Sequence, residues 1–338
     1  MAYTTINKSK DHFNTKLYAG NNSTQSITGV GFQPDWVWVK CRNNGKHHSI
    51  YDNVRGVTKY ISSNLNAAEQ TNSGGVTAFN ADGFSVGNFG DVNASFNFAS
   101  WNWKGNGAGS SNSDGDITST VSANTTAGFS IVKFTANGTN NGTIGHGLGA
   151  APKIIFYKRL DSSDDWFVVY KYVDGTLDFM KLNALDAKTD LTLGTYGFST
   201  STTFTNLGFG NSQEYIAYCF AEKKGYSDFG SYTGNGNANG PFIYTGFKPA
   251  MVIFKNTSSS QDWVIKDNRR PGFNDINDVL YPNGDYVEGH GADVEFLANG
   301  FKIISTAGNV NLNGQTLIYM AFAAAPLVGS NNVPATAF

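Results

Sequence analysis

Residues 31–40, GFQPDWVWVK, alternate two tryptophans with two valines between a proline and a lysine. Side chains alternate between the two faces of a strand, so Trp36 and Trp38 share one face while Val37 and Val39 share the other. A strand that is apolar on both faces is usually buried on both. The stretch therefore predicts a core strand. The alternative is that the two tryptophans form an exposed platform that stacks on sugar rings.

The same pattern occurs twice more, in GLGAAPKIIFYK at 147–158 and in GFKPAMVIFK at 246–255. In all three copies a proline precedes a lysine by six residues, and His48, Trp166 or Trp263 follows the lysine by eight. Such internal similarity indicates a repeated structural unit. The two later copies carry isoleucine, phenylalanine or methionine where the first has its tryptophans. These residues keep the apolarity but lose the flat stacking surface, so we expect packing to be the shared role.

The composition is typical of an all-β protein. Phe 25, Tyr 16 and Trp 6 stand beside Gly 39 and only 15% charged residues, which suits short aromatic strands joined by tight turns. We therefore predict three tandem, mutually similar antiparallel β-sandwich units of jelly-roll-like type, arranged either linearly or around a pseudo-threefold axis. The expected segments are unit 1 with an N-terminal arm at 1–104, a Gly/Ser/Thr/Asn-rich linker at 105–127, unit 2 at 128–225, unit 3 at 226–324 and a C-terminal arm at 325–338. Short surface helices are expected at 64–70 and 182–188.

Charge and hydropathy exclude several classes of partner. The formal net charge is −2 and lysine and arginine form no long runs, which argues against a nucleic-acid partner. No stretch approaches 18 consecutive apolar residues, so we expect no membrane insertion. Cys41 and Cys219 are far apart in the sequence and predict buried free thiols in a reducing compartment. The polar N-terminal residues predict a protein that is made in the cytoplasm and not secreted.

The sequence carries no H-E-x-x-H or P-loop motif. We therefore assign no catalytic, cofactor-binding or metal-binding residues and predict a protein that is not an enzyme. The densest acidic stretch is DSSDDW, with Asp161, Asp164 and Asp165. It could supply the acid pair of a glycosidase or part of a calcium site, but a solvated turn between two strands is the favoured interpretation.

Two histidines are candidates for contact with a ligand or a partner protein, because His146 and His290 are each flanked by glycines that allow close backbone approach. The alternative is that each histidine caps its own turn. Asp164 and Asp165 are kept as candidates of the same kind. Asp52 with Arg55, and Asp267 with Arg270, recur at the same three-residue spacing and predict structural ion pairs.

Several segments together resemble a known family. They are the G-F-x-P strands, DNVRGVTKYISSNLNAAE, NWKGNGAGSSNSDGDITSTVSANTTAGFSIV and IAYCFAEKKGYS. Over about residues 3–335 the chain resembles the β-rich, tail-fibre-like virion proteins of marine and cyanobacterial tailed bacteriophages.

That resemblance implies a virion structural protein, most simply a tail-fibre or adhesin subunit that mediates host attachment. A capsid decoration or collar protein is the alternative, and a polysaccharide depolymerase is the third possibility. The expected partners are other virion proteins and a host-surface glycan, and the expected assembly is a homo-oligomer, with a trimer favoured.

Overall fold

The computed structural model describes residues 4–171, 173–191, 197–271, 274 and 276–326. Antiparallel strands dominate these ranges, which confirms the predicted all-β class. The two α-helices, α1 (Gly90–Asn93) and α2 (Gly308–Asn311), have four residues each. In the described part of the chain, no helix has the length and apolar character that a membrane span requires.

The first unit contains a four-stranded sheet in the order β1-β9-β3-β4 and a three-stranded sheet in the order β2-β8-β7. Its strands are β1 (Phe13–Ala19), β2 (Gln25–Thr28), β3 (Trp36–Cys41), β4 (Ser49–Asp52), β5 (Lys59–Tyr60), β6 (Gln70–Thr71), β7 (Val76–Asn80), β8 (Gly83–Val86) and β9 (Asn97–Trp103). A 3-10 turn at Ser9–Asp11 precedes β1.

The second unit contains an eight-stranded sheet in the order β10-β11-β12-β19-β14-β15-β16-β17 and a two-stranded sheet of β13 and β18. Its strands are β10 (Ser110–Asn112), β11 (Ser119–Asn124), β12 (Phe129–Thr135), β13 (Thr143–Gly145), β14 (Ile154–Arg159), β15 (Phe167–Tyr170), β16 (Asp178–Lys181), β17 (Thr189–Asp190), β18 (Thr203–Thr205) and β19 (Glu214–Phe220).

The third unit contains one four-stranded sheet in the order β20-β27-β22-β23 and another in the order β21-β26-β25-β24. Its strands are β20 (Ser227–Thr233), β21 (Phe242–Tyr244), β22 (Phe247–Asn256), β23 (Val264–Asp267), β24 (Ile276–Val279), β25 (Gly289–Leu297), β26 (Gly300–Ile303) and β27 (Thr316–Pro326).

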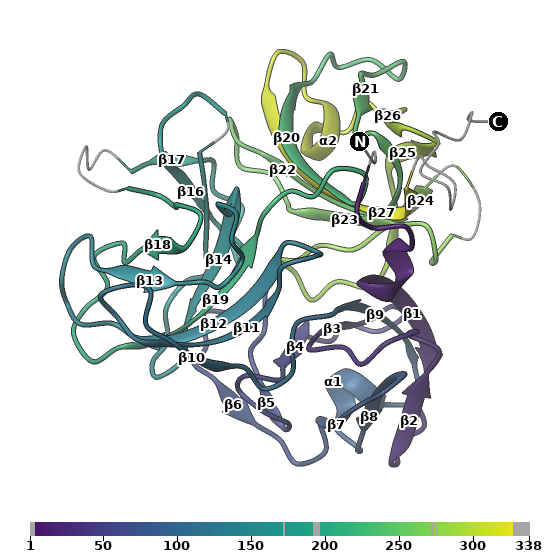
Figure 1. The fold of residues 1–338 in the computed structure, drawn as a ribbon. Coiled ribbons are helices and arrows are strands. Elements are labelled where there is room, and N and C mark those ends of the chain that lie inside the picture. Colours follow the sequence, from purple (N-terminus) through teal and green to yellow (C-terminus); the bar gives the residue numbers. More distant parts are fainter. Residues whose placement is uncertain (1–3, 172, 192–196, 272–273, 275, 327–338) are drawn as a thin grey trace.

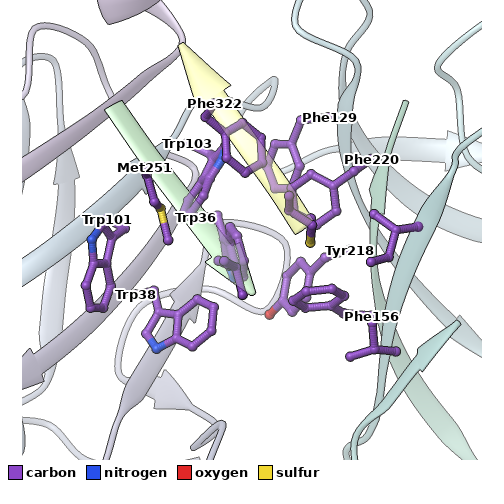
Figure 2. Packing of buried hydrophobic residues seen from close by; sticks show 14 of the residues in the cluster. Trp36, Trp38, Trp101, Trp103, Phe129, Phe156, Tyr218, Phe220, Met251 and Phe322 are labelled. Carbon is purple, nitrogen blue, oxygen red and sulfur yellow. The ribbon is translucent and has the colours of Figure 1, made fainter. Parts of the chain in front are cut away.

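Three inner sheets repeat one strand order. They are β1-β9-β3-β4, the central part β12-β19-β14-β15 of the eight-stranded sheet, and β20-β27-β22-β23. Each inner sheet presents one face to a common core, which gathers residues from all three units (Figures 1 and 2). The ring of Trp36 is tilted against that of Tyr218 of the second unit at 4.6 Å between centroids, and the ring of Trp103 lies 5.4 Å from that of Phe322 of the third. The units therefore surround a shared centre instead of following one another along a line.

The other face of each inner sheet packs against an outer sheet and forms a separate core. Trp36 and Trp38 face the common core, whereas Val37 and Val39 face the outer core of the first unit. All four side chains are buried, which confirms the prediction of a strand buried on both faces. The repeated strands divide in the same way, with Ile154, Phe156, Met251 and Ile253 inward and Ile155, Tyr157, Val252 and Phe254 outward.

Two local expectations need correction. The segment 105–127, expected to be a linker, contains β10 and β11, which extend the second inner sheet at its edge. Residues 64–70 and 182–188, expected to be helical, consist mainly of turns and irregular backbone instead. Their backbone amides bond to the adjacent unit, as when Glu69 N donates to Leu160 O at 2.9 Å. These bonds replace those of a helical turn. Of the predicted C-terminal arm, residues 327–338 lie outside the described residues.

Candidate functional site

Three straps, at 62–69, 181–188 and 281–288, are loops that each connect two strands of one unit and lie against the next unit. A buried lysine anchors each of them. Lys158 Nζ donates to Asp164 O of its own loop at 2.6 Å and to Asn66 O of the first strap at 3.0 Å. The other two lysines repeat this arrangement, Lys40 with Lys46 O and Asp285 O, and Lys255 with Gln261 O and Leu185 O. The anchors close a ring, because each unit holds the strap of the preceding one.

These lysines are the residues that end the repeated G-F-x-P strands. Burial lowers the pKa of Lys40, Lys158 and Lys255 to about 8 in each case. A buried ammonium group is costly unless its hydrogens are satisfied, and the two carbonyl oxygens at each anchor supply acceptors. The repeated lysine is therefore a structural anchor at the boundary between units.

The position eight residues after each lysine makes a second contact across the same boundary. Trp166 Nε1 donates to Ser62 O at 2.8 Å, and Trp263 Nε1 donates to Lys181 O at 2.8 Å. In the first unit His48 takes this place. Its Nδ1 accepts the indole N–H of Trp38 at 2.8 Å, so Nε2 carries the hydrogen donated to Tyr281 O at 3.0 Å. Burial lowers the pKa of His48 well below its usual range, which keeps it neutral.

The predicted ion pairs are present and buried. Arg55 Nε lies 2.5 Å from Asp52 Oδ2, and Arg270 Nε lies 2.6 Å from Asp267 Oδ2. Each carboxylate also accepts a hydrogen bond from the neighbouring unit, from Tyr218 OH for Asp52 at 2.7 Å and from Trp101 Nε1 for Asp267 at 3.0 Å. These pairs therefore stabilise the boundaries between units in addition to their own loops.

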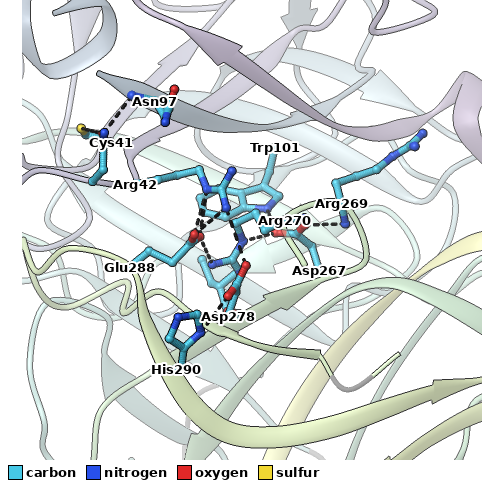
Figure 3. A network of polar contacts seen from close by, with 12 residues as sticks. Cys41, Arg42, Asn97, Trp101, Asp267, Arg269, Arg270, Asp278, Glu288 and His290 are labelled. Carbon is cyan, nitrogen blue, oxygen red and sulfur yellow. Dashed lines mark hydrogen bonds and ion pairs between the residues drawn. The ribbon is translucent and has the colours of Figure 1, made fainter. Parts of the chain in front are cut away.

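Around the second ion pair a larger network joins the first and third units (Figure 3). Glu288 lies at its centre, 2.6 Å from Arg42 Nη2 and 3.0 Å from Arg270 Nη1. Arg42 also lies 3.6 Å from Asp278, whose other oxygen is 3.0 Å from His290 Nδ1. His290 is thus the exposed end of the network, with 75% of its side chain accessible.

His146, the other candidate histidine, is fully buried in the second unit. Its Nδ1 accepts the N–H of Leu148 at 3.1 Å, and its Nε2 lies 3.2 Å from Thr200 O. Burial lowers its pKa. Both ring nitrogens are therefore engaged in holding the turn, as in the turn-cap interpretation, and the structure does not bring His146 and His290 together.

Asp164 and Asp165 lie in the loop that receives the first strap. Asp164 Oδ1 accepts the N–H of Asp165 at 2.8 Å, and its own N–H donates to Asn66 O at 2.8 Å. Asp165 accepts from Asn183 Nδ2 at 2.8 Å and pairs with Lys181 at 2.8 Å. Burial opposes the ionisation of Asp165, but the bonds from Lys181 and Asn183 lower its pKa. The two acids thus hold a loop together.

A cluster that the sequence did not reveal joins Asp174, Asp178 and Asp190, whose ligand atoms lie within 4.8 Å of one another. Lys188 Nζ contacts all three, at 2.7 Å from Asp174 and 3.0 Å from Asp178, with Asp190 as its third partner. Burial raises the pKa of Asp178 to about 6. The ammonium group occupies the place that a cation would take, so the cluster is an ion-pair network.

An aromatic pocket of about 350 Å³ opens on the outer side of the second unit. In its wall, Phe209 and Tyr215 stack on each other at 4.0 Å between ring centroids, and Phe167 and Phe179 meet edge to face at 5.5 Å. Asp164 is at its margin. Tyr215 OH donates to Gln213 Oε1 at 3.0 Å, so these two polar groups of the wall are hydrogen-bonded to each other.

One comparison with known protein families gives a match that covers almost the whole fold. A family model described as a domain of unknown function, DUF7483, matches residues 8–326. The matched range begins before β1, ends with β27 and thus contains all three units. A search of the curated proteins finds no match to this chain.

Proposed function

The chain belongs to the DUF7483 family, and we propose that it is a non-enzymatic structural protein of a bacteriophage virion, serving as a tail-fibre or adhesin subunit in host attachment. The observation that carries the proposal is the ring of anchors around one common core. Such a body keeps its shape because separating one unit would expose apolar surface and break the anchors of two boundaries.

The chemistry of the candidate residues supports a structural role. His146 and Asp165 are engaged by neighbouring groups of their own unit, and the acids clustered around Asp178 are paired with Lys188. Asp164 and Asp165 of DSSDDW bond to groups of their own loop and of a strap, which is not the arrangement of a glycosidase pair facing across a groove. The resemblance to tail-fibre-like virion proteins supports a phage virion as the particle in which this structural role is performed.

The three-unit architecture bears on how many copies assemble. Fibres commonly assemble as trimers, and this chain places three related sheets around one centre. A trimer remains the prediction for the assembled protein, with other virion proteins as neighbours. The mass of the purified chain in solution, measured by light scattering, tests that expectation.

Immunogold labelling of virions tests the proposed function directly. Gold at the tips of tail fibres is the expected result, together with slower adsorption of phage when purified chain is added in excess. Gold confined to the head or collar would replace attachment by a decoration or collar role. Virions without label would contradict a structural role in the particle. Depolymerase activity that is lost in Asp164→Asn and Asp165→Asn would contradict the non-enzymatic assignment.

A further inference from the structure

A second pocket, of about 470 Å³, lies at the junction of the second and third units. Its wall includes Glu222 and Asp228 from the segment entering β20 and Tyr244 from the end of β21. Tyr244 is 59% exposed, which is high for a large aromatic residue, and Phe242 on the same strand is 47% exposed. Ile243 between them is buried in the outer core of the third unit.

The fold itself does not need these aromatic side chains. One buried isoleucine marks the equivalent position in the outer sheet of each unit, because in each case it pairs with a phenylalanine of the neighbouring strand. These isoleucines are Ile27, Ile144 and Ile243. On this register, Tyr244 corresponds to Thr28 in the first unit and to Gly145 in the second, and both equivalents lack a ring. The exposed ring of Tyr244 is therefore an addition specific to the third unit.

Two carboxylates face the same pocket. Glu222 Oε1 accepts from Lys153 Nζ at 2.5 Å and from the N–H of Phe229 at 3.1 Å, and Asp228 Oδ2 accepts from Tyr319 OH at 2.6 Å. Within the described residues, no hydrogen bond occupies the second oxygen of either carboxylate. These bonds fix the positions of both groups while leaving an acceptor on each.

From this geometry we propose that the pocket at Glu222, Asp228 and Tyr244 binds a neutral sugar residue of a glycan. The ring of Tyr244 stacks on the apolar face of the pyranose, and the carboxylates accept hydrogen bonds from its hydroxyl groups. Phe242 lies about 7 Å further along the strand on the same face, where it extends the surface toward a second sugar. Lys224 is also part of the wall and Lys153 pairs with Glu222, so the two carboxylates are balanced by two ammonium groups and the pocket suits a neutral sugar. The proposal deepens the attachment role and rests on it.

The test uses the full chain on an array of neutral oligosaccharides of glucose, galactose and mannose and of acidic oligosaccharides, followed by calorimetric titration of the best binder. Tyr244→Ala should weaken binding of a neutral glycan at least tenfold, and Asp228→Asn and Glu222→Gln should weaken it at least threefold. Tyr244→Phe, which keeps the ring, should stay within threefold. Tyr286→Ala, at another exposed tyrosine in the third strap, is the matched control and should stay within twofold.

Equal thermal midpoints for Tyr244→Ala and the unchanged chain would show that the variant remains folded. Binding to acidic glycans alone, no binding to any neutral glycan at millimolar concentration, or unchanged affinity in Tyr244→Ala would overturn the inference. Each of these results is compatible with gold labelling at fibre tips, so the failure of this site is distinguishable from the failure of the attachment role.

Discussion

The hydroxyl group of Tyr218 in the second unit donates a hydrogen bond of 2.7 Å to the buried carboxylate of Asp52 in the first. That carboxylate is also paired with Arg55 at 2.5 Å, so one acid serves its own loop and the neighbouring unit together. The corresponding contact between the first and third units joins Trp101 to Asp267 at 3.0 Å. The boundaries between units are therefore built from buried polar bonds as well as from apolar packing.

A double-mutant cycle measures the Tyr218–Asp52 contact. We expect Tyr218→Phe to lower the free energy of unfolding by about 1–2 kcal/mol, because a buried bond to a charged acceptor is lost. Asp52→Ala should lower it by about 3–5 kcal/mol, because Arg55 loses its buried partner. The two changes together should cost about 1–2 kcal/mol less than their sum.

The control for that cycle is Asp82→Ala. Asp82 bonds to backbone amides of the outer sheet in the first unit, at Gly29 and Gly31, and has no part in the boundary. Its effect should add to that of Tyr218→Phe within about 0.5 kcal/mol. Full additivity of Tyr218→Phe with Asp52→Ala in urea unfolding would show that the contact contributes nothing.

Removing one lysine anchor should destabilise the protein markedly. Lys158→Met leaves the carbonyl group of Asp164 without its lysine donor and removes one of the two donors to Asn66 O, which we expect to cost about 2–4 kcal/mol in the free energy of unfolding. Lys133→Met is the matched control, because Lys133 is one-third exposed and pairs with Glu214 at the surface at 3.4 Å. It should cost less than about 1 kcal/mol. Equal urea midpoints for the two variants would contradict the anchor role.

Acid should weaken the boundary at His48. Its pKa is lowered on folding by burial, so the unfolded chain binds more protons than the folded chain below the ordinary histidine pKa of about 6.5. Stability is therefore complete above about pH 6.5 and falls as the pH decreases below it, with a limiting slope of about 1.4 kcal/mol per pH unit for this one group. Thermal midpoints measured from pH 7 to pH 5 should decrease accordingly.

A variant at this histidine assigns that dependence. His48→Gln keeps an acceptor for Trp38 and a donor for Tyr281 but cannot titrate, so the decrease between pH 7 and pH 5 should become smaller than in the unchanged chain. An unaltered pH profile in His48→Gln would show that another group causes the acid sensitivity.

Much of the fold can be predicted from side-chain patterns, because those patterns report burial. The alternation in Trp36–Val39 predicts burial of both faces, and the recurring proline and lysine predict repeated strands. The buried Asp52–Arg55 pair can be predicted from its second copy in the third unit. Each of these features requires particular residue types, so it can be recognised in the sequence.

The ring of anchors could not be predicted in the same way. Each anchor lysine bonds to a backbone carbonyl group of a strap. Any residue type can supply that carbonyl oxygen, so the strap needs no particular side chain there. The pairs are Lys158 with Asn66, Lys255 with Leu185 and Lys40 with Asp285. The straps have sequences with helical propensity, but their amides bond to the neighbouring unit instead, a tertiary preference that outweighs a weak local one.

The strands of 105–127 and the site at Tyr244 were missed for different reasons. β10 and β11 consist largely of Ser, Thr and Asn, a composition that suits a linker as well as a solvent-facing edge strand. Tyr244 stands where the other units have Thr28 and Gly145, but that comparison needs the strand register, which spacing in the sequence does not provide.

Differential scanning calorimetry of the full chain tests most directly whether the three units form one body around a common core. We expect a single unfolding transition with a ratio of calorimetric to van't Hoff enthalpy near one. Trp36→Ala should move that whole transition to lower temperature, with a loss of about 3–5 kcal/mol. Separate transitions for the units, or a Trp36→Ala variant in which only part of the heat absorption moves, would contradict the shared core.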